Sequence, residues 1–531
     1  MSEESGTNRY AILLTAVFLV ICGFAISRHE MWRDEIQAWL VARDSASLLD
    51  LFRNLKYEGH QELWYLVLMP LTRISTNPAI MQIVHLLTAG TTVYLTARYA
   101  PFTRLQKFLI AFGYFYGYEY ALISRNYALG VLFITLFCIL YAQRRSHFLA
   151  IGVVLFLLSQ TNPHCLIIAM ITAAALLPEL MGPKRNFLTG PLAESAQVRY
   201  GVVLIAIGIG TAILQLPPPA DSGYAVGWHW DFDPGRLKHV INLVSEAYLP
   251  LPVPSQHFWG THWLEQAYTF RSWQTAISLV LLAVVSLTLL RSPVALFIFL
   301  AGTSALLLFF YIKFFGSMRH HGFLFILLLM AVWIQRSSGP QAGPPGARRH
   351  LPVPGWHAGS LQQHLLTGIL LFQLAGGAIA LTMDVRHAFS FGKAAADYIV
   401  SRGMQDMLLV GDIDAPVSTI VGYLGKGRAY YLRSGHSGSF VVWNKARLGS
   451  VSDEEAVRKA GELADDRREN VLLVLNRALG RDLIDPDSMC MLAGFTGSII
   501  GDEDFYLYLV RPQDGNGSRW PPDACNGRVK T

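Results

Sequence analysis

Long apolar runs alternate with short polar stretches over roughly the first 380 residues of this 531-residue chain. A membrane-spanning helix needs about 20 predominantly apolar residues, and fewer where neighbouring helices shield its ends. By that rule the pattern predicts a polytopic bundle of about eleven spans. They lie near residues 10–26, 78–97, 107–122, 127–142, 148–159, 164–180, 200–216, 273–290, 294–312, 322–335 and 362–382.

The segment 63–74 fits either a twelfth span or a helix lying in the membrane interface, because it is short and contains Pro70. Basic loops tend to stay in the cytoplasm. With 63–74 in the interface, the basic clusters all fall in alternate gaps, which predicts a multi-pass plasma (inner) membrane protein with a cytoplasmic N-terminus. The clusters are residues 98–107, 143–147, 183–185, Arg291 and 335–349.

Five polar segments then share the outer face of the membrane. Two of them are long enough to fold over the bundle: the first outer loop, 27–77, and the fourth, 217–272. The other three are short turns at 123–126, 160–163 and 313–321. Residues with unusual chemistry gather in these segments, which favours a site that opens to one side.

The pattern changes after about residue 384, so we predict a membrane module over 1–383 and a soluble α/β domain over 384–531. On the topology above, this domain is extracytoplasmic. The Gly/Pro-rich segment 338–355 reads as a cytoplasmic loop. Strands are predicted at 407–412, 429–434, 439–444 and 471–476, and helices at 416–425 and 453–468.

Composition agrees with a membrane protein. Hydrophobic residues make up 52% and charged residues 15% of the chain, with a mean hydropathy of +0.35, whereas soluble domains are about one-quarter charged. The formal charge of +6 does not indicate nucleic acid, because the basic residues sit between apolar runs. Cys490 and Cys525 fall in the polar tail and could form a disulfide outside the cell.

The first outer loop opens on WRDE, which places Asp34 and Glu35 directly after the first span. Charges beside lipid are costly unless they have a use. Residues 35–55 read as one amphipathic helix able to roof a cavity. The end of the loop, KYEGHQELWY, brings His60 and Glu62 back to the membrane.

Arginine and histidine recur in the other outer segments. Arginines at a membrane interface suit a phosphate, because the guanidinium group forms paired, charge-assisted hydrogen bonds. The Trp-rich stretches of the fourth outer loop suit a sugar ring or an interfacial aromatic belt. The candidate substrate-binding residues are Arg125, Arg319, His320, His60, Glu62, Glu119, Tyr127 and His321, with Asp34 and Glu35 as candidate catalytic residues.

Purely structural explanations compete with several of these functional roles. Asp34 and Glu35 could be solvated charges at a helix start, and Arg125 could be an anchor whose side chain reaches the lipid head groups. Glu119 could pair with Arg125. His164 is more readily explained as a structural histidine.

An acidic pair after the first span, a long first outer loop and a soluble domain after the last span together resemble the GT-C superfamily of membrane glycosyltransferases. The resemblance covers roughly residues 1–380. Its relatives include protein O-mannosyltransferases and the lipid A aminoarabinose transferase. The stretch GHQELWY has His60 but lacks the prolines of the His-Pro-Pro-like element that several relatives carry.

The resemblance implies an inverting transfer of a hexose or pentose from a polyprenyl-phosphate donor to a hydroxyl of a glycan, lipid or protein acceptor. Asp34 would be the general base, supported by Glu35, while the arginines and histidines hold the lipid phosphate. No metal site is predicted, although a divalent ion between Asp34 and Glu62 stays open.

Two other functional classes also stay open. A transporter or flippase of lipid-linked saccharides would show inverted repeats and broken helices at mid-membrane, and we find no repeat in the sequence. A catalytically inactive membrane scaffold would tolerate replacement of Asp34.

Overall fold

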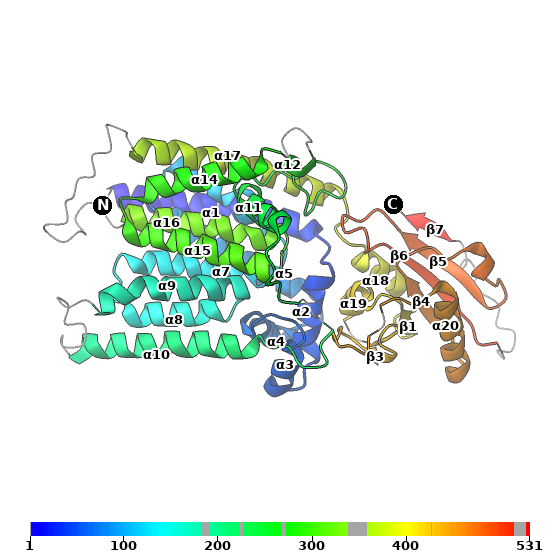
Figure 1. The fold of residues 1–531 in the computed structure, drawn as a ribbon. Coiled ribbons are helices and arrows are strands. Elements are labelled where there is room, and N and C mark those ends of the chain that lie inside the picture. Colours follow the sequence, from blue (N-terminus) through cyan, green and yellow to red (C-terminus); the bar gives the residue numbers. More distant parts are fainter. Residues whose placement is uncertain are drawn as a thin grey trace, which may run out of the picture.

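The computed structural model describes residues 2–181, 192–223, 227–266, 272–337, 358–425, 427–447, 449–513 and 527–530. The basic cluster 183–185, the loop 338–355 and Cys525 lie outside these residues. Figure 1 shows a bundle of roughly parallel helices with a smaller domain at one of its ends. The N-terminal end of α1 (Ser2–Arg28) lies at the opposite end of the bundle from that domain.

Helices cover each of the eleven predicted spans. Among the described residues, six helices are long and apolar enough to cross a membrane by length and composition, and the other apolar helices are shorter. The third predicted span is broken into α6 (Arg104–Ala111) and a π-helical turn, η1 (Tyr114–Glu119). The remaining ones are α5 (Ala79–Tyr99), α7 (Tyr127–Tyr141), α8 (Phe148–Ser159), α9 (Pro163–Met181), α10 (Leu192–Gln215), α14 (Gln274–Leu289), α15 (Pro293–Ile312), α16 (Met318–Ser337) and α17 (Ala358–Arg386).

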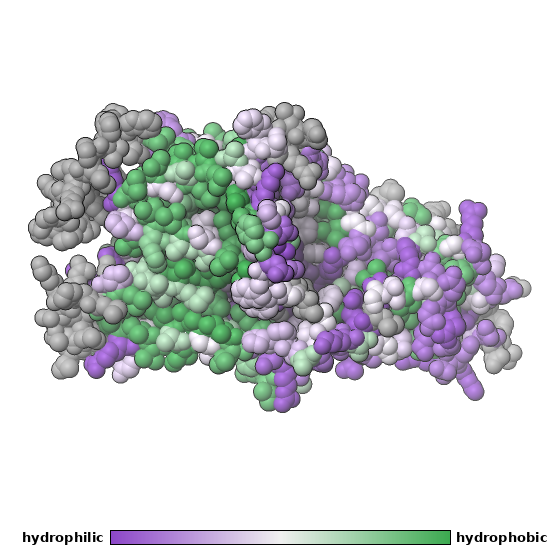
Figure 2. Space-filling view, in the orientation of Figure 1, coloured by the Kyte–Doolittle hydropathy of each residue, from purple (hydrophilic) through white to green (hydrophobic). Residues whose placement is uncertain are grey.

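The polarity of the surface differs between the bundle and the smaller domain (Figure 2). Apolar residues cover the bundle, whereas polar residues dominate the smaller domain (Figure 2). Exposed side chains such as Leu13, Val20 and Leu214 lie on this apolar surface. Lipid can cover such residues, so their exposure carries no penalty. The chain is a membrane protein built mainly of helices.

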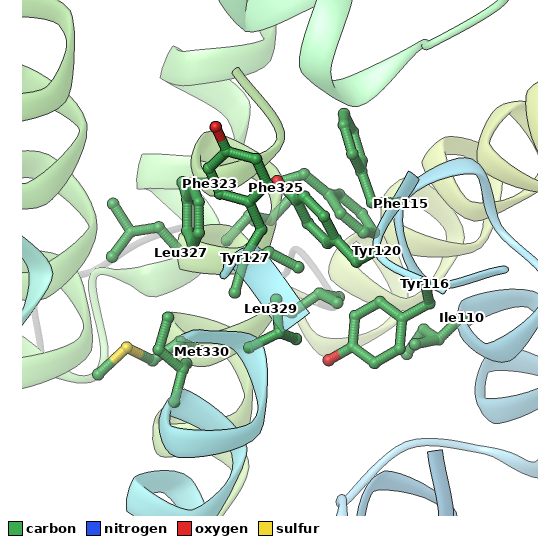
Figure 3. Packing of buried hydrophobic residues seen from close by; sticks show 14 of the residues in the cluster. Ile110, Phe115, Tyr116, Tyr120, Tyr127, Phe323, Phe325, Leu327, Leu329 and Met330 are labelled. Carbon is green, nitrogen blue, oxygen red and sulfur yellow. The ribbon is translucent and has the colours of Figure 1, made fainter. Parts of the chain in front are cut away.

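Helix α16 runs through the centre of the bundle, and nearly all of its residues from Met318 to Ile334 are buried. Aromatic rings pack where it meets η1 and α7 (Figure 3). Phe325 stacks on Phe115 at 5.9 Å between ring centroids, and Phe323 lies 5.7 Å from Tyr120. Tight packing here fixes the outer ends of α7 and α16, which carry several candidate site residues.

The first outer loop forms three helices: α2 (Arg33–Asp44), α3 (Leu48–Leu55) and α4 (Leu63–Ile74). They lie between the bundle and the smaller domain (Figure 1), so the segment 63–74 sits at one end of the bundle. The prediction of a single amphipathic helix over 35–55 is wrong. A break at residues 45–47 separates α2 from α3, and α2 is buried because α4 and the smaller domain cover it.

The fourth outer loop also folds over the bundle. It contains α11 (Pro234–Tyr248), which packs against α14 and α16, and the short α12 (Trp263–Gln266). Pro234 at the first helical position and Asp233 at the N-cap start α11, since the Asp233 carboxylate accepts from the Gly235 and Arg236 backbone N–H groups.

The C-terminal domain contains a seven-stranded mixed sheet in the order β3-β2-β1-β4-β6-β5-β7. β1 pairs in parallel with β2 and β4, and β6 pairs antiparallel with β4 and β5. The strands are β1 (Leu408–Gly411), β2 (Ala429–Tyr431), β3 (His436–Gly438), β4 (Val471–Leu475), β5 (Met489–Phe495), β6 (Phe505–Val510) and β7 (Arg528–Lys530).

Helices cover both faces of this sheet. Leu472 and Val474 of β4 pack with α18 (Gly392–Ser401) and α19 (Asp414–Tyr423), while Val471, Leu473 and Leu475 pack with α20 (Asp453–Arg467). This burial on both faces explains why β4 reads as an unbroken apolar run. The predicted strand at 439–444 is wrong: only an isolated bridge joins Asn444 to Ser222, and the segment instead follows α2.

The C-terminal domain is fastened to the first outer loop by hydrogen bonds. The Arg33 N–H donates to Glu503, and its guanidinium group pairs with Asp502 at 2.6 Å. The Gln37 side chain donates to the Val441 carbonyl and accepts from the Val441 N–H, at 2.8 and 3.0 Å. These contacts hold the domain over the start of α2.

Replacement of Gly322 by alanine is expected to destabilise the protein. A β-carbon there would collide with the Phe115 ring and the Tyr120 hydroxyl, and overpacking costs about 1–3 kcal/mol. Thermal unfolding in detergent should show a lower Tm for Gly322→Ala. The matched control is Gly210→Ala, because Gly210 has open space around it. Equal Tm values for the two variants would contradict the close packing of α16 against η1.

Candidate active site

Glu35 is fully buried and ties two outer segments together. Its Oε2 accepts from the Trp32 N–H and contacts Nε2 of His29 at 3.0 Å, while its Oε1 accepts from the Ser124 N–H at 2.5 Å. The WRDE turn and the short outer turn at 123–126 therefore meet at one carboxylate. Glu35 faces the protein interior and not the cavity, so its geometry is that of a positioning residue.

Asp34, the neighbour of Glu35, points the other way. Its Oδ2 accepts from the Arg319 guanidinium at 3.0 Å, and its side chain is 28% exposed. Burial alone raises the pKa of the Asp34 carboxyl, but the guanidinium groups of Arg319, Arg125 and Arg33 outweigh burial and hold the pKa below its ordinary value. Asp34 is therefore ionised at neutral pH.

Two tryptophan rings hold Arg319. Its guanidinium carbon lies 5.2 Å from the ring centroid of Trp32 and 5.2 Å from that of Trp259. The Trp259 indole N–H donates to Glu119, which also accepts from the Tyr114 hydroxyl. Cation–π contacts of this kind stabilise a cation by about 0.5–2 kcal/mol. Arg319 is thus held in place before any ligand arrives.

Arg125 is buried beside Asp34, the residue with which Arg319 pairs. One of its nitrogens donates to the backbone carbonyl of Asp34, and Nη2 lies 3.1 Å from Nε2 of His60. Burial, and then the charge of Arg125, lower the pKa of His60 to about 3. His60 is therefore neutral, and Nε2 accepts from Arg125.

His320, Tyr127 and His164 form a second polar group. The Ser317 N–H donates to Nδ1 of His320, so neutral His320 carries its proton on Nε2 and donates to the Tyr127 hydroxyl at 2.9 Å. The His164 ring lies 5.1 Å from the His320 ring and is stacked on Phe323. Among the described residues, neither ring nitrogen of His164 has a hydrogen-bond partner.

A cavity of about 660 Å³ joins these groups. The ends of α9, α10 and α15 contribute apolar lining residues such as Pro163, Ile213 and Phe309, while α19 and the segment after β3 contribute Ser418 and Trp443. Its charged lining comprises five basic and two acidic side chains: Arg33, Lys56, Arg125, Lys313 and Arg319 against Asp34 and Glu58. Burial raises the pKa of Glu58 to about 7, which weakens its share of the negative charge.

The structure brings six of the ten candidate site residues to this cavity: Asp34, His60, Arg125, Tyr127, Arg319 and His320. Glu35, Glu62, Glu119 and His321 are not among its lining residues. His321 contacts Glu246 of α11 at 3.5 Å, and its Nε2 lies 2.9 Å from the carbonyl of Phe315 in the turn before α16. Glu119 contacts Tyr114 and Trp259 and not Arg125, so the alternative in which it pairs with Arg125 is wrong.

Several residues that line the cavity were not predicted as site residues from the sequence. His164, which we interpreted as structural, lines the cavity, and so do Gln37, Ser418 and Trp443. Trp259 belongs to the Trp-rich fourth outer loop, for which the sequence left open a sugar platform or an aromatic belt, and its ring lies against Arg319. A signal existed for Lys313, which belongs to the same basic turn as Arg319. None existed for Ser418 and Trp443, because their position depends on how the C-terminal domain docks.

The hypothesis of a divalent ion between Asp34 and Glu62 does not fit the site. Within the described part of the chain, no group of three or more His, Cys, Asp or Glu side chains is placed to hold a metal ion. Glu62 begins α4 outside the cavity, and guanidinium groups surround the Asp34 carboxylate. Like charge around the carboxylate opposes a second cation.

The described structure combines a helical bundle, an acidic turn after its first helix, helices in the first outer loop and a C-terminal α/β domain. The chain is similar to a crystal structure of ArnT from Cupriavidus metallidurans bound to undecaprenyl phosphate, with a TM-score of 0.53 and 13% identity over 96% of this chain and 99% of that one.

An apo structure of the same ArnT gives a TM-score of 0.48 at 13% identity, covering 94% of this chain and 97% of that one. No family model and no curated protein sequence matches the chain. At 13% identity, the likeness to the lipid-bound structure shows the fold alone.

The stability of the protein is expected to fall as pH rises from about 6.5 to about 10. Burial lowers the pKa of His29, but the charges of Asp384 and Glu35 outweigh it and raise the pKa to about 10. A raised pKa in the folded state stabilises below the ordinary value of 6.5, and this contribution is lost as pH climbs through the folded value. Thermal unfolding across this pH range measures the effect.

His29→Gln should flatten this pH dependence and lower the Tm at pH 6.5, because it removes the cation between two buried carboxylates. The control is His147→Gln, whose histidine is exposed at the other end of the bundle. If the Tm values of wild type and His29→Gln fall in parallel as pH rises, His29 is not the protonated group that stabilises the fold.

Proposed function

We propose that this protein is a membrane glycosyltransferase that moves a sugar from a polyprenyl-phosphate donor to an acceptor hydroxyl at the extracytoplasmic face. The observation that carries the proposal is the convergence of Arg125 and Arg319 with Asp34 in one cavity at the end of the bundle. A phosphate needs the cations, and the attack of a hydroxyl needs the carboxylate.

The charge balance of the cavity supports an anionic ligand. Arg125 and Arg319 lie beside the carboxylate of Asp34, and the other acidic lining residue, Glu58, has a raised pKa. Buried cations are stabilised by counter-charge, so an anion that enters beside the two arginines is favoured. The fold-related ArnT binds undecaprenyl phosphate in its crystal structure, which supports the same ligand chemistry here.

The apolar wall of the cavity supports a lipid carrier. Ile213 and Leu216 from the end of α10 and Phe309 from α15 line it, and Ile213 is 48% exposed at the bundle surface. A lipid tail can lie along such residues while its phosphate reaches the arginines. The cavity therefore offers a cationic end and an apolar end, as a polyprenyl phosphate requires.

The extracytoplasmic location rests on charge and on the C-terminal domain. The described basic clusters at 98–107, 143–147 and Arg291 lie at the ends of helices away from that domain (Figure 1), as cytoplasmic loops do. Cys490 in β5 is disulfide-bonded, and disulfides persist mainly in oxidising compartments. Both features support a cavity on the outer face of a plasma (inner) membrane.

The reaction is a single displacement that inverts the anomeric carbon. The acceptor oxygen bonds to that carbon, its proton passes to Asp34, and the bond from the carbon to the phosphate oxygen breaks with its electron pair on the polyprenyl phosphate. Arg125 and Arg319 stabilise this developing charge, which is commonly the largest electrostatic contribution to catalysis. His320, through Tyr127, and neutral His60 orient the polar groups of the donor.

Donor binding also adjusts the base. A carboxylate with a lowered pKa is a weak base, and Asp34 is held low by its arginines. A phosphate bound to Arg319 and Arg125 shares their charge and adds its own negative charge. The pKa of Asp34 then rises toward the value that proton abstraction needs, but only when donor is present.

Arg319→Gln is expected to weaken binding of undecaprenyl phosphate to the purified protein by about 10- to 100-fold, since hydrogen bonds to charged groups contribute about 1.5–3 kcal/mol. Native mass spectrometry with added lipid measures this. Arg53→Gln is the matched control, because Arg53 is exposed on α3 and does not line the cavity. Equal affinity of both variants would remove Arg319 as a phosphate ligand.

Asp34→Asn should separate binding from turnover. Loss of the carboxylate removes a negative charge beside the arginines, so undecaprenyl phosphate should bind as well as before or more tightly. Transfer of the sugar identified from co-purifying lipid should fall by about 10²–10⁴-fold, the usual contribution of a general base. Full transfer activity in Asp34→Asn would contradict the assignment of the base.

A further inference from the structure

A second, larger groove of about 1070 Å³ lies at the other end of α2. The membrane module supplies one wall through the ends of α2 and α4, with Arg43 and Arg73. The C-terminal domain supplies the other through Arg428 and the residues from His436 to Val442. None of the groove residues lines the cavity that holds Asp34.

Basic side chains outnumber acidic ones in this groove. Arg43, Arg73 and Arg428 line it together with one carboxylate, that of Asp44. Arg43 donates to Asp44 through Nε and Nη2, both at 2.8 Å, and its side chain is 9% exposed. Its Nη1 is buried and has no hydrogen-bond partner among the described residues. An unmade hydrogen bond of a buried charged group is costly, so this nitrogen favours an anionic ligand.

The rest of the lining is suited to a sugar. Thr76 on the membrane-module wall and Ser437 on the wall of the C-terminal domain line the groove, and both residues are exposed. Arg73 is fixed beside Arg43, because its Nη1 and Nη2 donate to the backbone carbonyls of Arg43 and Ser45 at 3.4 and 3.2 Å. Hydroxyls and a fixed guanidinium group can together bind a saccharide that carries a phosphate or carboxylate.

The segment 439–443 connects this groove with the catalytic cavity. Ser439 and Val442 line the groove, Trp443 lines the cavity, and Gln37 of α2 holds Val441 between them. Ten residues separate Asp34 from Asp44 along α2. At 1.5 Å per residue, the groove lies about 15 Å from the reacting carboxylate.

We infer that this groove binds an anionic group of the acceptor glycan, at a distance of about 15 Å from the hydroxyl that receives the sugar. That the bound saccharide is the acceptor rests on the proposed function. The affinity of the groove for an anionic saccharide can be measured independently of that function. The C-terminal domain then contributes to acceptor recognition, since Arg428 and Ser439 belong to it.

Binding of a singly phosphorylated mannotetraose to the full-length protein in phosphatidylcholine nanodiscs tests the inference. The phosphorylated sugar should bind at least about tenfold more tightly than the same sugar after phosphatase treatment, because hydrogen bonds to a charged group are the strong ones. Arg43→Gln and Arg428→Gln should abolish this preference. Arg428 is exposed, so its replacement leaves the fold intact, and Arg53→Gln serves as the charge-matched control.

Three results would overturn the inference. They are an absence of preference for phosphate in wild type, an unchanged preference in both groove variants, and competition by phosphatidylglycerol that the groove variants relieve. The last would assign the groove to lipid head groups. Undecaprenyl phosphate binding, measured on the same variants, should stay unchanged. If the wild-type protein does not bind undecaprenyl phosphate but still prefers the phosphorylated saccharide, the proposed function is contradicted, whereas the inference that the groove binds an anionic saccharide is supported.

Discussion

The site depends on one electrostatic constraint: two guanidinium groups are held at the end of an apolar bundle with a single carboxylate between them. Arg125 and Arg319 both contact Asp34, one at its backbone carbonyl and the other at its side chain. Desolvated cations are unstable without partners. The surrounding architecture, from the tryptophan pair around Arg319 to the buried Glu35, keeps these charges together and leaves room for one more anion.

The two acids of WRDE have different tasks that follow from helix geometry. Consecutive residues at the start of α2 point about 100° apart, so Asp34 faces the cavity while Glu35 faces inward. Glu35 fixes the turn that carries Asp34 and the turn that carries Arg125. Through His29 it also reaches Asp384 at the end of α17. The reacting carboxylate is thereby connected to the scaffold through its neighbour.

The sequence was informative where the hydrophobic pattern decides the answer. The helices of the bundle and the α/β tail follow from the lengths and periods of apolar runs. Residues in separate outer turns were expected to meet because alternate gaps share one membrane face, and Asp34, Arg125, Arg319 and His320 do meet.

The hydrophobic pattern does not predict the direction of individual side chains or the docking of the C-terminal domain on the bundle. His321 and Glu119 occupy the right depth but point toward Glu246 and Trp259, which depends on helix rotation. The burial of α2 arises from the C-terminal domain that covers it, as does the loss of the predicted strand at 439–444. Both depend on contacts between segments about 400 residues apart, which local sequence does not encode.

The position of a bound polyprenyl phosphate tests the central claim most directly. A cryo-electron microscopy structure of the protein with undecaprenyl phosphate should place the phosphate within hydrogen-bond distance of Arg125 and Arg319, with the tail along Ile213 and Phe309. A phosphate seated elsewhere, with the Arg319–Asp34 pair still closed, would contradict the account.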